Sequence, residues 1–409
     1  MRILLLDNSH LPRIGGKEIV VHHLANQYLA LGHEVVLGGP SRIWADRKVR
    51  FSYPVKRLPS VSGLDKDMQW RMKVRWLLRG GYDIVHAHTT HPSGYAAARV
   101  LEDVAERGQS APPLVVTPHG ADIHKVPEVN FGKRLNPVLD EKIRWTLQRC
   151  GAATAISDSV RDSLLDAGID AEKIVPIANG VDAQRLGTPV DHDARATLGL
   201  DADAELIVSI GNFHPRKGHA TLVAATANSS REKLHLVIIG RTDPDFVADV
   251  ERRGLSSRVT FTGAIPFPVP GQNNGPDLTA ALLQQCNAYV SASMGEGTEG
   301  LSLALLEAMS AGTCIVATAV SGNRDIIEDG SNGLLVAPNS VEALTTAIDR
   351  VCANRVERDA LAAASTKTVE PYSWRAIAGQ YIELFERLLD PRTTTGADSN
   401  QPRAAGARP

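Results

Sequence analysis

The amino-acid sequence predicts an α/β protein built from two doubly wound domains. Three observations support this prediction. The chain has 409 residues, which is long for one hydrophobic core; 43% of the residues are hydrophobic and 22% charged, as in a globular protein; and short apolar runs alternate with longer helical patterns. Apolar runs of strand length with helices between them are typical of parallel strands buried on both faces.

The predicted strands fall into two sets of six. The first set covers residues 2–7, 33–39, 83–89, 114–120, 152–157 and 173–180, and the second covers 205–211, 235–240, 259–263, 288–293, 314–318 and 333–337. A polar, Asp-rich segment, 181–203, separates the sets. We therefore expect one Rossmann-like domain at 1–185 and another at 190–371, with a cleft between them, a closing helix at 372–389 that packs back on the first domain, and a disordered polar tail at 390–409.

Charge, cysteines and apolar segments exclude several classes of protein. The formal net charge is -2, which gives no reason to expect a nucleic-acid partner. The four cysteines are far apart and form no CxxC, which argues against a zinc site or disulfide framework and fits a reducing cytosol. The apolar start, residues 1–7, is too short for a signal-peptide core, and no run approaches the ~20 residues of a membrane span. We expect a cytoplasmic protein.

Chemically distinctive residues follow the predicted strands. Ligands of doubly wound folds collect at the carboxyl ends of the strands. At such positions the first half carries Gly15, Gly16, His88, His119 and Asp122. The second half has a glycine-flanked loop, GNFHPRKG, at 211–218.

Two glutamates surround the start of a predicted helix in the second half. Glu307 interrupts the apolar run LSLALLEAM, and Glu299 lies eight residues earlier. Ser302 is a credible N-cap for this helix and Gly312 would end it. The free amides and positive dipole end of the helix would then lie between two carboxylates, which suits a diphosphate with sugar hydroxyls on both sides. The alternative is that Glu307 reaches the surface or pairs with a nearby arginine.

Several motifs in order resemble those of the family-4 retaining glycosyltransferases, which have the GT-B fold. Glu299 and Glu307 match the glutamate-x7-glutamate signature of that family. The other matching segments, from about residue 1 to 389, are DNSHLPRIGGKEIVVHHLANQYLALGHEV, VTPHGADI, IANGVD, GNFHPRKG, AVSGNRDIIEDGSNGLLV and YSW. The resemblance implies transfer of a hexose from a UDP- or GDP-sugar to a glycan, lipid-linked or small-molecule hydroxyl, without a metal or other cofactor.

The resemblance also implies roles for individual residues. Glu299 would contact the transferred sugar, Glu307 the ribose, and Lys217 the diphosphate. His119 would face the sugar near the reacting carbon. The remaining contacts with the nucleotide-sugar donor would come from Asn212, Arg216, Gly300, Leu301, Ser302 and Leu303. The residues that approach the acceptor or the phosphates would be Gly15, Gly16, His88 and Asp122.

One position departs from the family pattern. The family has an arginine directly after the first glycine of its G-R-x4-K-G loop, where this chain has Asn212. Asparagine cannot neutralise a phosphate, so Arg216 is a candidate replacement, against the simpler interpretation of a solvated loop cation. This departure supports an alternative function, a non-catalytic sugar-nucleotide-binding or scaffold protein of the same fold. An NAD-type oxidoreductase is disfavoured because no GxGxxG follows a strand, and the motifs favour transfer over epimerisation.

Apparent metal motifs have simpler interpretations. The DxD triplets at 65–67, 191–193, 201–203 and 243–245 lie in polar turns or the linker, where Asp is common. His86 and His88 share a face of one strand and His91 follows, but we expect no carboxylate beside them. The sequence predicts no metal site.

A basic stretch and an enlarged loop complete the predictions. Residues 42–79 hold eleven Lys or Arg against three Asp, with five aromatic residues interleaved. This composition favours either a solvated basic surface or peripheral contact with the inner face of a membrane. The Pro/Gly-rich loop at 262–277 is expected to approach the nucleotide base.

Overall fold

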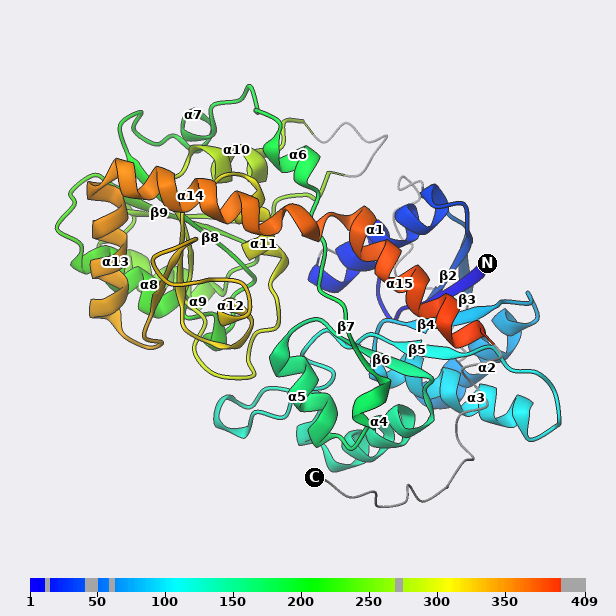
Figure 1. Ribbon diagram of the computed structural model, residues 1–409. Helices are drawn as coiled ribbons and strands as arrows, with labels where there is room; N and C mark the ends of the chain where they lie inside the picture. Colours follow the sequence, from blue (N-terminus) through cyan, green and yellow to red (C-terminus); the bar gives the residue numbers. More distant parts are fainter. Residues whose placement is uncertain (12–14, 41–50, 59–62, 269–274, 391–409) are drawn as a thin grey trace, which may run out of the picture.

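The computed structural model describes residues 1–11, 15–40, 51–58, 63–268 and 275–390. It contains two parallel β-sheets, each flanked by helices, and these form the two lobes in Figure 1. Residues 391–409 of the predicted tail, part of the basic stretch and the centre of the 262–277 loop lie outside the described residues. In the described part, no helix is both long and apolar enough to cross a membrane.

The first sheet has seven strands in the order β3-β2-β1-β4-β5-β6-β7. Their bounds are Arg2–Leu6 (β1), Glu34–Pro40 (β2), Val55–Leu58 (β3), Ile84–Ala87 (β4), Leu114–Val116 (β5), Ala152–Ala155 (β6) and Ile174–Pro176 (β7). All six predicted strands are confirmed, but the count of six is wrong because β3 was missed. β3 is a four-residue edge strand, VKRL, with two cations, so it lacks the apolar run that marks a central strand.

The second sheet has the six predicted strands in the order β10-β9-β8-β11-β12-β13. Their bounds are Glu205–Ile210 (β8), Leu234–Ile239 (β9), Val259–Gly263 (β10), Ala288–Ser291 (β11), Ile315–Thr318 (β12) and Leu334–Val336 (β13). Every strand pair in both sheets is parallel. The prediction of two doubly wound sheets is therefore confirmed.

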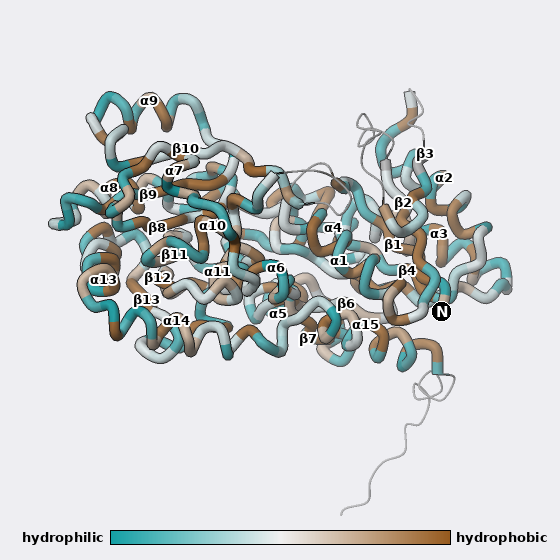
Figure 2. The backbone as a smooth tube through the Cα atoms, turned by 90° about the horizontal axis from the view of Figure 1, so that it is seen from above, coloured by the Kyte–Doolittle hydropathy of each residue, from teal (hydrophilic) through white to brown (hydrophobic). Residues whose placement is uncertain are grey.

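Helices cover both faces of each sheet, with hydrophobic clusters between. Those that follow the first-sheet strands are Gly16–Ala30 (α1), Lys66–Leu78 (α2), Tyr95–Ala105 (α3), Pro137–Arg149 (α4) and Asp158–Asp166 (α5). The connecting segment carries Ala183–Gly187 (α6) and Ala194–Leu198 (α7). The second half has His219–Asn228 (α8), Pro244–Arg252 (α9), Leu278–Gln285 (α10), Leu303–Ser310 (α11), Ser321–Arg324 (α12), Val341–Ala353 (α13) and Arg355–Val369 (α14). In Figure 2 the strands are mainly hydrophobic, while loops at the rim are hydrophilic.

The last helix, Trp374–Leu389 (α15), returns to the first lobe. Figure 1 shows α14 over the second lobe and α15 over the first. Tyr381 and Phe385 of α15 are buried with Ile3 and Leu5 of β1 and with α1. The chain therefore crosses between the lobes twice, once between β7 and α6 and once before α15.

The strand order places two switch points beside the space between the lobes. The order reverses between β1 and β4 in the first sheet and between β8 and β11 in the second. Segments after β1, β8 and β11 lead into α1, α8 and α11. Ligands of doubly wound sheets bind at such points, so these segments are the first place to look for a site.

Candidate active site

A cleft of about 900 Å³ lies between the lobes and is lined from both. We call its sides the first wall and the second wall, after the first and second sheets. Of the predicted site residues, the cleft brings together Gly15, Gly16, His119, Asp122, Asn212, Arg216, Lys217, Glu299, Gly300, Leu301, Ser302, Leu303 and Glu307. His88 is fully buried behind His119 and is not among the lining residues.

Glu299 is the centre of the second wall. Its carboxylate accepts hydrogen bonds from Lys217 Nζ at 2.5 Å and from an Arg216 guanidinium nitrogen at 2.7 Å. Burial alone would raise the pKa of Glu299, but the two adjacent cations outweigh burial and lower it. Glu299 is therefore a carboxylate at neutral pH, and it holds the lysine predicted to meet the diphosphate.

Glu307 is paired with an arginine, as the alternative interpretation expected, although the sequence did not show which arginine. Arg185 of α6 donates to Glu307 at 3.0 Å and to Asp277 at 2.6 Å. Burial raises the pKa of Glu307, and Asp277 adds to this effect while Arg185 opposes it. The ion pair with Arg185 explains why a carboxylate is tolerated in an apolar helix. Glu307 and Arg185 still both line the cleft, so the pair is open to a ligand.

The start of α11 lies between the two glutamates. Ser302 occupies the N-cap position as predicted, but its side chain accepts no hydrogen bond from the first turn. Gly312, with φ of 74°, ends the helix as predicted. The first-turn amides therefore have no side-chain cap beside Lys217 and Glu299, which is the arrangement that favours an anion.

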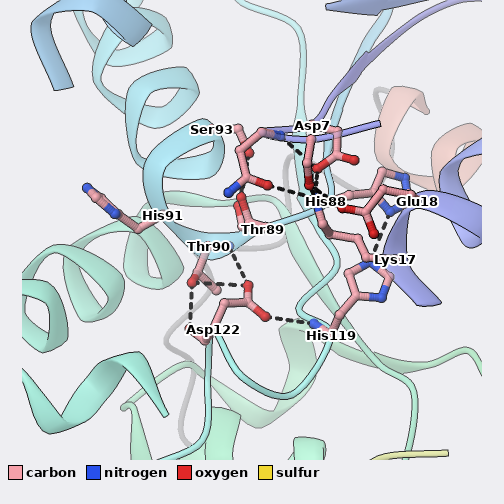
Figure 3. Close-up of polar contacts among 12 residues, drawn as sticks. Asp7, Lys17, Glu18, His88, Thr89, Thr90, His91, Ser93, His119 and Asp122 are labelled. Carbon is pink, nitrogen blue, oxygen red and sulfur yellow. Dashed lines mark hydrogen bonds and ion pairs between the residues drawn. The ribbon is translucent and has the colours of Figure 1, made fainter. Parts of the chain in front are cut away.

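The first wall carries a network of buried polar groups (Figure 3). Asp122 accepts from the His119 backbone N–H at 2.8 Å and from the Thr90 N–H at 2.8 Å. His88 Nδ1 lies 3.2 Å from His119 Nε2. Burial lowers the pKa of His119 to about 4, against a smaller opposite effect of Asp122, so its imidazole is neutral at pH 7.

Lys17 is a lining residue of the first wall that sequence reasoning missed. It follows Gly15 and Gly16 directly and is ion-paired with buried Asp7, with Asn8 Oδ1 at 2.6 Å. Burial raises the pKa of Asp7 to about 6, although Lys17 opposes the shift. The only signal was the position of a lysine beside two glycines after a strand.

Arg216 and Asn212 are placed differently from each other. Arg216 bonds to Glu299 and, at 2.8 Å, to the Thr298 carbonyl, and it lies over the Phe131 ring with 4.6 Å to the centroid. It is therefore not a solvated loop cation. The Asn212 side chain instead faces Arg241, a lining residue at the end of β9 that the sequence did not single out.

The histidines and DxD triplets have structural partners. The rings of His86 and His88 lie against each other, as expected for side chains on one face of the sheet, with centroids 4.1 Å apart and planes tilted by 40°. The expectation that no carboxylate accompanies these histidines is wrong for His91, which points away from the cleft network in Figure 3 and meets Asp67 Oδ1 at 2.7 Å. Asp65, Asp193 and Asp243 cap α2, α7 and α9. Within the described ranges, no three His, Cys, Asp or Glu are grouped to hold a metal ion.

The described parts of the 262–277 loop reach the cleft. Residues 264–268 are among its lining, and Phe267 lies under Arg185 at 5.7 Å and edge-on to His23. Through Arg185, the Phe267 ring is thus placed near Glu307 in the cleft.

Comparison with known proteins agrees with this arrangement. Residues 14–185 match the family model "Glycosyltransferase Family 4", and residues 204–354 match "Glycosyl transferases group 1". The chain is 25% identical over 390 residues to a phosphatidyl-myo-inositol mannosyltransferase of Mycolicibacterium smegmatis, covering 94% of this chain and 89% of the relative. It is 26% identical to a D-inositol 3-phosphate glycosyltransferase of Frankia alni, covering 92% and 95%.

Solved structures share the fold. Sucrose-phosphate synthase from Thermosynechococcus elongatus superposes with a TM-score of 0.75 at 24% identity, over 95% of this chain and 98% of that one. HepE of Anabaena in complex with UDP-glucose superposes with a TM-score of 0.74 at 21% identity, over 94% and 99%.

Proposed function

The chain belongs to the group 1, family 4 glycosyltransferases, which transfer a sugar from a nucleotide sugar, and from this premise we propose how its cleft does so. The donor binds the second wall, the acceptor binds the first wall, and residues 1–185 and 190–371 act as acceptor and donor domains. One observation carries the proposal: Glu299, Lys217 and the open start of α11 meet at one point of the cleft.

The second wall promotes departure of the nucleoside diphosphate. Lys217 and the amides near Ser302 and Leu303 stabilise the charge that grows on the diphosphate as its bond to the sugar carbon breaks. The acceptor oxygen forms the new bond to that carbon on the same face, and the hydroxyl proton leaves with a phosphate oxygen. Glu299 binds hydroxyls of the transferred sugar, and Glu307 binds those of the ribose.

The first wall holds the acceptor hydroxyl. The neutral imidazole of His119 donates or accepts one hydrogen bond without adding charge. Asp122 fixes the backbone of His119, and His88 supports its ring from behind. Gly15 and Gly16 leave room for the acceptor because they carry no side chain.

A thermal-shift experiment tests the donor assignment. UDP, GDP, ADP and NAD⁺ are added to the purified protein, each with and without Mg²⁺. A nucleotide at a hundred times its Kd adds about 2.7 kcal/mol of stability. Stabilisation by one nucleoside diphosphate and not by NAD⁺ supports the proposal and identifies the base. A folded sample that none of them stabilises contradicts it.

We also propose that the acceptor is carried on a lipid or is a small polyol phosphate. The two relatives compared above are named for phosphatidyl-myo-inositol and D-inositol 3-phosphate. In this chain, α2 presents exposed Met68, Met72 and Trp76 at four-residue intervals, each 46–52% exposed, while its other apolar residues Trp70, Val74 and Leu77 are buried. Exposed apolar residues beside Arg71, Arg75 and Arg79 suit peripheral contact with anionic lipid at the inner face of a membrane.

Vesicle sedimentation tests the membrane contact. Wild type should sediment with vesicles of phosphatidylglycerol and phosphatidylcholine, and both an Arg71/Arg75/Arg79→Glu variant and a Met68/Met72/Trp76→Ser variant should lose this binding. Arg252/Arg253/Arg355→Glu, on α9 and α14, is a matched charge control that should bind like wild type. Wild type that stays in the supernatant contradicts the membrane proposal and leaves the small polyol phosphate as acceptor.

A further inference from the structure

The feature that carries a further inference is the pairing of Asn212 with Arg241. Asn212 follows β8, and Arg241 follows the adjacent strand β9. The Asn212 side-chain oxygen accepts from the Arg241 backbone N–H at 3.0 Å and from its Nε at 3.4 Å. Phe213 N–H in turn donates to the Arg241 carbonyl at 2.7 Å, so the two loops are joined side by side.

A glycine makes this approach possible. Gly240, with φ of 135°, precedes Arg241, and a Cβ on it would collide with the carbonyl oxygen of Gly211. The backbone of Arg241 is therefore brought directly against the loop that carries Asn212 and Lys217. All three residues line the second wall of the cleft.

The cations of the second wall differ in whether they already have a carboxylate partner. Arg216 and Lys217 share the carboxylate of Glu299. Arg185 is held by Asp277 and Glu307. Arg241 is exposed, and no carboxylate of the described residues lies within 4.0 Å of its guanidinium. Among the described residues of this wall, Arg241 is the cation whose charge is not paired with a carboxylate.

We infer that Arg241 binds the diphosphate of the donor, and that Asn212 is a positioning residue that orients it. This inference rests on the proposed function. Asn212 stands where the resemblance expects an arginine, and its oxygen accepts from Arg241 N–H and Nε. In this chain the positive charge next to the expected position comes from the end of β9, and the Asn212 amide oxygen accepts the hydrogen bonds that hold it there.

Titration calorimetry with UDP, GDP and ADP tests the inference on the full-length protein. For the nucleoside diphosphate that wild type binds, Arg241→Gln should raise the Kd about tenfold, which is the low end for a charge-assisted contact at an exposed site. The corresponding nucleoside should bind equally to both proteins. Asn212→Ala should raise the Kd of the diphosphate by a smaller factor and leave the Kd of the nucleoside unchanged. Arg252→Gln, on α9 and outside the cleft, is the matched control and should bind like wild type.

A charge-relocation variant makes the test specific. Asn212→Arg/Arg241→Gln returns the arginine to the family position and should recover most of the lost affinity, with the melting temperatures of all variants alike. Unchanged diphosphate affinity in Arg241→Gln, or an equal loss for nucleoside and diphosphate, overturns the inference while leaving the proposed function intact. Wild type that binds none of the three diphosphates overturns both.

Discussion

At the scale of single residues, Glu299 joins the two cations predicted to serve the donor. Because its carboxylate contacts the transferred sugar in the proposed complex, Glu299→Gln should lower kcat at least about 100-fold. The affinity for the nucleoside diphosphate should not weaken, since Lys217 is released from its carboxylate partner. Steady-state kinetics and calorimetry measure the two quantities. A large loss of diphosphate affinity would mean that Glu299 acts on the nucleotide instead.

Glu307 offers a contrast, because it has both a proposed ligand and a structural partner. If it binds the ribose, Glu307→Gln should raise the Kd of the nucleotide about tenfold with little change in melting temperature. Glu205→Gln is a suitable control, because it removes a comparable ion pair with Arg231 outside the cleft. A fall in melting temperature with an unchanged Kd would assign Glu307 to the Arg185 pair alone.

The residues found from sequence were those that break a local pattern. Glu307 was visible because a carboxylate interrupts an apolar helix, and Asn212 because it departs from a motif. Arg185 and Arg241 lie in polar segments where an arginine is ordinary. Their significance comes from contacts with Glu307, 122 residues away, and with Asn212, 29 residues away, which no local pattern encodes.

At the scale of elements, the loop from Gly211 to Gly218 depends on its last residue. Gly218 has φ of 65°, and a Cβ there would collide with the Ala292 carbonyl oxygen at the end of β11. Gly218→Ala should therefore destabilise the protein by more than about 2 kcal/mol and abolish diphosphate binding.

Gly254 has a similar backbone conformation and serves as a control, because it separates the cost of backbone strain from the cost of a steric collision. Gly254 has φ of 71°, and a Cβ at this position would meet no neighbouring atom within 4 Å, so Gly254→Ala should cost only about 1 kcal/mol. Urea unfolding of the two variants measures the difference. Equal costs would mean that the contact with β11 is unimportant and that backbone strain explains both.

Elements were predicted well where burial imposed a pattern. The central strands are buried on both faces, so their sequences are continuous apolar runs that cannot be confused with loops. β3 lies at an edge and β7 is only half-buried. These two strands show that the apolar run in the sequence becomes weaker as burial of the strand decreases. In α2 the apolar residues Met68, Met72 and Trp76 are exposed while Trp70, Val74 and Leu77 are buried, and this choice of face depends on packing against the sheet.

At the scale of the whole molecule, buried neutral histidines predict sensitivity to acid. Burial lowers the pKa to about 3 for His10, His23 and His86, and to about 4 for His22, His119, His124 and His219. The unfolded chain therefore binds more protons than the folded one between these values and pH 6.5, so stability is present above pH 6.5 and is lost as the pH falls toward 4. Buried Asp7, whose pKa is raised, opposes this trend only slightly.

The expected loss is several kcal/mol between pH 6.5 and 5, since each such histidine contributes up to about 1.4 kcal/mol per pH unit. Thermal unfolding at a series of pH values measures it. The effect should persist in 1 M NaCl, because it comes from burial and not from long-range repulsion. A melting temperature that is constant from pH 7 to 5 would contradict the assignment of neutral buried histidines.

The relation between the lobes was the part least accessible to sequence. The pattern of strands gives two sheets, but their mutual placement depends on single contacts such as Arg216 over Phe131 and Phe267 edge-on to His23 at 5.7 Å. These contacts join residues that have no shared periodicity.

The loop that carries Glu299 is part of the second lobe and is hydrogen-bonded to the first lobe, and this has a thermodynamic consequence. Ser159 of α5 donates to the Glu299 carbonyl at 3.2 Å, and Asn179, after β7, donates to the Leu301 carbonyl at 2.7 Å. Separating the lobes would break these bonds on either side of the carboxylate. A sugar that repositions Glu299 must therefore change the free energy of lobe separation, and separation must change sugar affinity by the same factor. Domain opening and donor occupancy are thus linked equilibria.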